Sequence, residues 1–137
     1  MMKVKLSEII DAIDFTDDST SYYLDMKTGE IVMINDMIMD RSECEALSDQ
    51  LDEHGCYELP DQHEIDDYGT MERFIATLTS QAAGRLSRAI SGRGAFRRFK
   101  DMVQEMGIED QWYAFEEDAH RKLAIRWCEE YGLEWEE

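Results

Sequence analysis

RLSRAISGRGAFRRFK, residues Arg85–Lys100, contains two helical patterns separated by a glycine-containing break. Before the break, apolar residues recur at helical spacing: Ala82, Leu86, Ala89 and Ile90. Gly92 and Gly94 permit backbone conformations that interrupt a helix. The stretch therefore predicts two consecutive helices joined by a short turn.

Helical periodicity continues on both sides of this stretch, so we expect the chain to be helical from about Ile65 onward. A buried stripe is expected before it, at Met71, Phe74, Ile75 and Leu78. The helix after the break should bury Phe96, Phe99, Met102, Val103 and Met106 and end at Gly107. A last helix, with Asp110 as its cap, should bury Trp112, Phe115, Ala119, Leu123, Trp127 and Tyr131 and end at Gly132. Arg126 lies near this inward row, either snorkelling or in a buried ion pair.

The first 60 residues show both helix and strand patterns. A short helix is expected from Lys5 to Ile13, with Ser7 as its N-cap. The segments 21–24 and 30–34 are rich in Tyr, Ile and Val, and Gly29 lies in the connection between them, which predicts a β-hairpin.

A second helix is expected from Asp40 or Ser42 to His54, because Gly55 follows as a stop signal. The segment 56–59, ended by Pro60, is expected to be a third short strand beside the hairpin. Unpaired hairpin edges would allow a homo-oligomer.

Charge is distributed unevenly along the chain. Residues 1–72 carry 20 Asp and Glu against four Lys and Arg, whereas residues 73–100 carry seven Lys and Arg and no acid. The whole chain has a formal net charge of −18, which disfavours DNA and anionic membranes as partners of the surface as a whole. Half of the 14 cationic side chains therefore lie in one short, basic segment.

Length and composition indicate one domain of 137 residues in a cytoplasmic setting. The three cysteines are odd in number and form no CxxC pattern, which suggests reduced thiols. The N-terminal residues do not resemble a signal peptide, and no apolar run is long enough to span a membrane.

The segments GRGAFRRFKD (92–101), WYAF (112–115) and AIRWCEEYGL (124–133) together resemble the signature of a bacterial family described as Uncharacterised Protein Family 0158. The segment ELPDQHEIDDYGTMERFI (58–75) is similar to the part that leads into that signature. The resemblance covers mainly the C-terminal 80 residues. It implies kinship, and it implies no activity.

The candidate binding site is the part of the basic segment that spans residues 85–100. Its members are Arg85, Arg88, Arg93, Arg97, Arg98 and Lys100, with Gly92 and Gly94 as flexible backbone before a helix. Exposed N–H groups at a helix start, reinforced by arginines, suit a phosphate-containing ligand or an acidic protein. The alternative is internal, since arginine also pairs with carboxylates of the same chain and the N-terminal half offers many of them.

Other constellations give weaker signals. Glu117 and His120 have the E-x-x-H spacing of a di-iron helix, but no second copy exists, so a solvated face is expected for His120. The set Cys44, His54, Cys56 and His63 has no common zinc spacing, and the acids at 61–67 lack a calcium-loop pattern. No nucleophile motif and no phosphate-binding loop is present, so we expect neither a catalytic site, a metal nor a cofactor.

These patterns predict an α+β fold. A hairpin or small antiparallel sheet with helices (1–60) would pack on a C-terminal bundle of about four helices (61–137). The expected function is non-enzymatic intracellular binding or regulation through residues 85–100. Two alternatives remain: an enzyme or enzyme subunit acting on a phosphorylated or nucleic-acid substrate, and an acidic mimic of nucleic acid that binds a basic protein.

Overall fold

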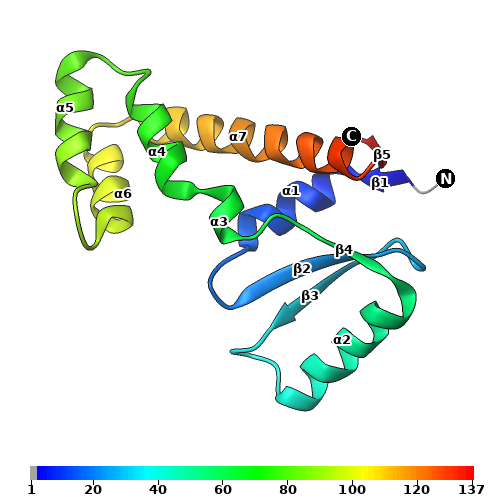
Figure 1. Cartoon of the computed structure of the whole chain (residues 1–137). Helices are drawn as coiled ribbons and strands as arrows, with labels where there is room; N and C mark the ends of the chain where they lie inside the picture. The colour runs from blue at the N-terminus through cyan, green and yellow to red at the C-terminus, as the bar shows by residue number, and fades with distance from the viewer. Residues whose placement is uncertain (1–2) are drawn as a thin grey trace. The chain divides into compact units, whose positions relative to one another are not determined.

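A computed structural model of the chain describes residues 3–137, and these form two compact units (Figure 1). The first, the α/β unit, consists of residues 3–65 together with His120–Glu137. The second, the helical unit, is Asp66–Ala119. The C-terminal residues thus belong with the N-terminal half of the chain, whereas the expected division at residue 60 grouped them with the helices.

The elements of the α/β unit begin with β1 (Lys3–Lys5) and α1 (Leu6–Phe15). They continue with β2 (Thr20–Asp25), β3 (Ile31–Asn35), α2 (Arg41–His54), β4 (Cys56–Glu58) and α3 (Gln62–Ile65). The helical unit contains α4 (Asp67–Ile75), α5 (Ser80–Ala89) and α6 (Ala95–Glu105). The long helix α7 (Glu109–Glu130) contributes to both units, and β5 (Glu134–Glu136) closes the chain. The expected α+β class is therefore confirmed.

The small antiparallel sheet has the strand order β3-β2-β4. The predicted hairpin is confirmed, with Tyr22 opposite Met33 and Leu24 opposite Ile31. Its connection contains Gly29 at φ +77°, a conformation that favours glycine. The predicted third strand is confirmed as β4, which pairs with β2 on the side away from β3.

The second helix begins as its sequence predicts. Asp40 is its N-cap, and the Asp40 carboxylate accepts a hydrogen bond of 2.8 Å from Glu43 N. Gly55 follows the helix at φ +80°. The first helix differs from expectation, because Lys5 occupies the cap position and no side chain caps α1; the prediction of Ser7 as N-cap is wrong.

The core of the α/β unit brings α1 together with the end of α7. The fully buried α1 residues Leu6, Ile9 and Ile13 pack with Ala124, Trp127 and Cys128. Trp127 also donates a hydrogen bond of 2.9 Å from Nε1 to Glu58 O, which ties α7 to β4. Beside this core, β1 and β5 form a parallel pair in which Val4 lies opposite Trp135.

The core of the helical unit is built around three aromatic residues. Phe74, Phe99 and Trp112 make edge-to-face contacts, with ring centroids 4.7–6.3 Å apart. Met71, Ile75, Leu86, Ile90, Ala95 and Val103 complete the buried cluster. The expected inward position of Phe96 is wrong, since its side chain is 48% exposed.

Three expectations for the last helix also need correction. The helix begins at Glu109, so Asp110 lies inside it and is not its cap. Tyr131 is 39% exposed, because the buried row of α7 runs through Ala124, Trp127 and Cys128. Arg126 is exposed, which contradicts the buried ion pair and leaves the snorkelling alternative. Among the described helices, none is both long and apolar enough to cross a membrane.

Candidate functional site

The turn between α5 and α6 is organised by Arg98. Its guanidinium donates hydrogen bonds from Nε to Ala89 O at 2.7 Å and from Nη2 to Ser91 O at 2.6 Å, and Nη1 donates to Arg93 O. Ala89 O lies at the end of α5, where backbone acceptors lack partners within the helix, and Ser91 O and Arg93 O lie in the connection to α6. Arg98 therefore satisfies the end of one helix from the first turn of the next.

Gly94 is required for this arrangement. Its φ is +75°, and a Cβ at this position would lie 2.9 Å from Arg98 Nη1. Gly92 also has a positive φ, of +78°. The two glycines let the chain reverse closely enough for the arginine to reach back over the turn.

A groove of about 380 Å³ lies between α5 and α6. Its lining consists of Arg85, Arg88, Ala89, Arg98, Asp101, Met102 and Glu105. Arg85 Nη2 is 3.8 Å from Glu105 Oε1 and donates to Met102 Sδ at 3.4 Å. The groove is thus lined by charges of both signs, and part of its positive charge is already paired.

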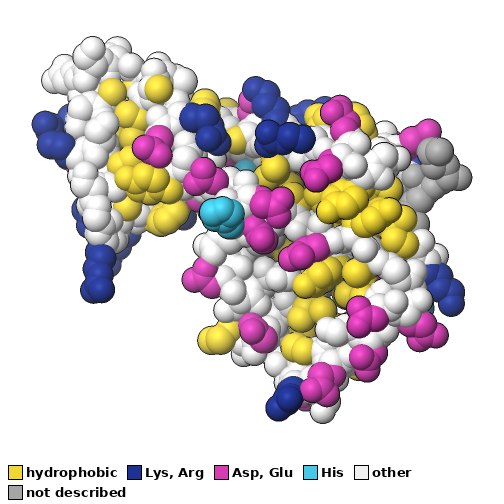
Figure 2. All heavy atoms as spheres, in the orientation of Figure 1, with side chains coloured by type: hydrophobic (Ala, Val, Ile, Leu, Met, Phe, Trp, Pro, Cys, Tyr) yellow, Lys and Arg dark blue, Asp and Glu magenta, His cyan; other side chains and the backbone are white. Residues whose placement is uncertain are grey.

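Five of the six cations of residues 85–100 are exposed, and Arg98 is the one that is hydrogen-bonded to the turn. We call the other four the basic surface: Arg88, Arg93, Arg97 and Lys100. Within the helical unit none of their side chains makes an ion pair. Arg97 lies on the face of α6 opposite the buried Phe99, and Lys100 is exposed at the side of the same helix. On the face drawn in Figure 2, carboxylates are numerous over the α/β unit, and Lys and Arg side chains project from the helical unit.

The eight predicted site residues therefore divide into three groups. Arg98, Gly92 and Gly94 build the turn, Arg85 faces Glu105, and the basic surface is open to solvent. The expectation that Arg98 reinforces an anion site at the start of α6 is not supported by its geometry, because its guanidinium is directed to carbonyl oxygens. Pairing of these cations with acids of residues 1–72 stays a prediction.

His120 is a residue whose environment the sequence analysis misjudged. It is 5% exposed, and its Nδ1 lies 2.5 Å from Asp14 Oδ1 on α1. The expected solvated face is therefore wrong. The carboxylate that accompanies this histidine comes from the other end of the chain, so helical spacing around His120 could not reveal it.

A second His–Asp pair is formed by His54 and Asp25. Asp25 is fully buried, and its carboxylate accepts from the backbone N–H groups of Lys27 and Thr28 and from Gln50 Nε2. Burial alone would raise the pKa of Asp25, but the hydrogen bonds from His54 and these other donors outweigh it and hold the pKa well below its usual range. The pair joins the hairpin turn to the end of α2.

Metal ligation receives no support from these clusters. Within residues 3–137, no group of three or more His, Cys, Asp or Glu could hold a metal ion. His54, which belonged to the weak zinc pattern, is the partner of Asp25 instead. Cys44, Cys56 and Cys128 are free thiols.

A family model described as Uncharacterised protein family (UPF0158) matches residues 1–135. The expectation that the resemblance is confined mainly to the C-terminal 80 residues is therefore wrong, since the match includes the N-terminal helix and hairpin. No curated protein and no solved structure matches the chain.

Proposed function

The chain belongs to the Uncharacterised protein family (UPF0158), and because this membership brings no activity with it, we propose a function from the geometry of the helical unit: non-enzymatic intracellular binding of an acidic protein segment through the basic surface. The observation that carries the proposal is the set of four exposed cations on α5, α6 and their connection that make no ion pair within that unit. The three free cysteines support an intracellular setting.

The spread of these cations favours an extended partner over a compact anion. Arg88 lies on α5, Arg93 in the connection, and Arg97 and Lys100 on the solvent face of α6. A phosphate-binding site instead requires donors that converge on one point. Arg98 cannot supply such donors, because its guanidinium already donates to three carbonyl oxygens. Separate carboxylates of an acidic segment match separate cations better.

Exposed charges such as those of the basic surface mainly supply specificity and a fast, salt-dependent association rate. The chain as a whole repels acidic molecules because of its net charge of −18. A partner would therefore have to present its carboxylates locally to the helical unit. This requirement makes the proposed contact selective for short acidic segments.

The enzyme alternative rests on the groove between α5 and α6. There Asp101 and Glu105 lie beside Arg85 and Arg88, so an acid and phosphate-binding cations share one cavity. Release of inorganic phosphate from p-nitrophenyl phosphate or ATP, lost in Asp101→Asn, would favour this alternative. The acidic-mimic alternative rests on the α/β unit, whose 22 Asp and Glu outnumber its seven Lys and Arg.

The proposal is tested with a fluorescein-labelled peptide of ten glutamates, titrated with the protein while anisotropy is measured. The Arg93→Glu/Arg97→Glu double variant should bind at least about tenfold more weakly than wild type, because two attractive contacts become repulsive. The control, Lys27→Glu/Arg41→Glu, makes the same change of charge in the α/β unit and should change affinity less than about twofold. Equal weakening by both variants would show that only net charge matters and would refute the site.

A further inference from the structure

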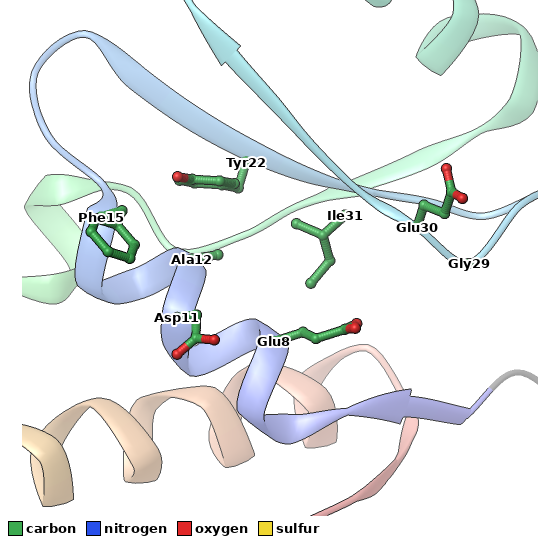
Figure 3. Close-up of a pocket in the computed structure, with 8 residues that line it drawn as sticks. All are labelled: Glu8, Asp11, Ala12, Phe15, Tyr22, Gly29, Glu30 and Ile31. Carbon is green, nitrogen blue, oxygen red and sulfur yellow. The ribbon is translucent and has the colours of Figure 1, made fainter.

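A groove of about 560 Å³ lies within the α/β unit, between α1 and the β2–β3 hairpin (Figure 3). Glu8, Asp11, Ala12 and Phe15 line it from α1, and Tyr22, Gly29, Glu30 and Ile31 line it from the hairpin. This volume is in the range of small-molecule sites. None of these residues belongs to the basic surface, so the groove is independent of the proposed function.

Four of the eight lining residues are apolar or aromatic: Ala12, Phe15, Tyr22 and Ile31. Figure 3 shows Ile31 and Tyr22 directed from the hairpin toward α1, where Ala12 and Phe15 lie. Phe15 is 70% exposed although it is a large apolar side chain, and it lies at the end of α1 that faces Tyr22. An exposed aromatic beside a concave apolar surface is typical of a surface that contacts a ligand.

The charges that line the groove are all negative. Glu8 and Asp11 lie one helical turn apart on α1, and Glu30 comes from the hairpin connection on the other wall. No Lys or Arg lines the groove, and across residues 3–137 these three carboxylates have no ion pair. They are exposed, so a ligand would not need to displace an internal partner.

We propose that this groove binds a linear aliphatic polyamine. The alkyl segments of such a molecule would cover Ile31 and Ala12, which removes apolar surface from water. Its ammonium groups would reach Glu8 and Glu30 at one end and Asp11 further along α1. The faces of Phe15 and Tyr22 add cation–π attraction at the far end, about 10 Å along α1 from Glu8.

The same features argue against other ligand classes. An anion would meet three uncompensated carboxylates. A bare divalent metal needs carboxylates that converge on one point, and none of the clusters in the described part of the chain does so. A metal would also gain nothing from the aromatic walls. A ligand with several positive charges on an apolar chain can contact both the carboxylates and the apolar residues of the groove.

The test is isothermal titration of the full chain with spermidine, and with magnesium chloride as a probe that carries charge without an apolar body. We expect saturable spermidine binding that weakens at least about tenfold in Glu8→Gln/Glu30→Gln. Asp49→Asn/Glu53→Gln, which removes two exposed carboxylates from α2, is the matched control and should change affinity less than about twofold. Circular dichroism checks that both variants are folded.

Three results would overturn the proposal. The first is the absence of saturable spermidine binding. The second is equal weakening in both double variants, which would mean that spermidine follows the overall negative charge. The third is tighter binding of a tri-arginine peptide than of spermidine, which would assign the groove to a basic protein segment. Because no variant here touches residues 85–100, a failure would leave the proposal for the basic surface unaffected.

Discussion

His54 Nδ1 lies 2.8 Å from Asp25 Oδ2, at the point where the end of α2 meets the hairpin turn. An ionised carboxylate can only accept, so Nδ1 carries the proton of this hydrogen bond. The carboxylate also accepts from two backbone amides and from Gln50, and it is fully buried. One side chain thus holds the turn and the helix end together.

The first prediction concerns the dependence of stability on pH. Because the pKa of Asp25 is lower in the folded chain than in the unfolded chain, its contribution is complete above the unfolded value of about 3.9. It is lost as the pH falls through the folded value. Asp25→Asn should therefore lower the free energy of unfolding at pH 7. The difference in this free energy between the variant and wild type should become smaller as the pH drops below about 4. Urea unfolding between pH 7 and pH 2.5 measures this.

Asp49→Asn serves as its control, since Asp49 is exposed on α2. This variant should follow the wild-type pH dependence closely. A wild-type curve and an Asp25→Asn curve that stay parallel through the acid range would contradict the assigned role of the Asp25 charge.

The second prediction concerns Arg98. Arg98→Ala removes three donors from carbonyls of Ala89 and of the connection between α5 and α6, and we expect the free energy of unfolding to fall by about 1–2 kcal/mol. Arg98→Lys keeps the charge but lacks the fork that reaches several carbonyls, so it should restore only part of the loss. Arg97→Ala, on the neighbouring exposed position, should change stability by less than about 0.5 kcal/mol. Urea unfolding that ranks Arg97→Ala as the more damaging change would contradict this role.

The third prediction compares two glycine substitutions. Gly94→Ala places a Cβ 2.9 Å from Arg98 Nη1 at a φ of +75°, so we expect a loss of about 1–2 kcal/mol. Gly84→Ala lies inside α5 with no atom within 4 Å of the added Cβ, and should stabilise by about 0.5–1 kcal/mol. Thermal unfolding of the two variants should shift in opposite directions; shifts of the same sign would show that the turn is not constrained as described.

The fourth prediction concerns thiol reactivity. Cys128 is fully buried, and burial raises its pKa to about 11, so it should resist alkylation in the folded protein. Burial also raises the pKa of Cys56, which is half-buried. Mass spectrometry after iodoacetamide treatment at pH 8 should find Cys44 modified first, Cys56 more slowly, and Cys128 only after unfolding. Early modification of Cys128 would contradict the packing of α7 on α1.

Local sequence signals predicted much of the fold. The hairpin was recognised from segments rich in Tyr, Ile and Val on either side of Gly29, and α2 from Asp40 and Gly55 at its ends. Both can be found without distant contacts. The parallel pair of β1 and β5 escaped prediction because it joins the two ends of the chain in strands of three residues each. Such short segments carry no periodicity of their own.

The candidate site was predictable in position but not in detail. Composition located the basic segment. It could not show that Arg98 donates a hydrogen bond to Ala89 O at the end of α5, whereas the neighbouring Arg97 is directed to solvent. The buried His120 has its hydrogen-bond partner in Asp14, 106 residues away. The groove between α1 and the hairpin likewise depends on two segments that approach each other only in the fold.

The central claim is that the basic surface receives an acidic protein segment. The most direct test is a titration of ¹⁵N-labelled protein with the ten-glutamate peptide, followed by amide chemical shifts. We predict saturable shifts concentrated at Arg88, Arg93, Arg97 and Lys100 and their neighbours on α5 and α6. Shifts located elsewhere, or no shifts at peptide concentrations well above the Kd measured by anisotropy, would contradict the claim.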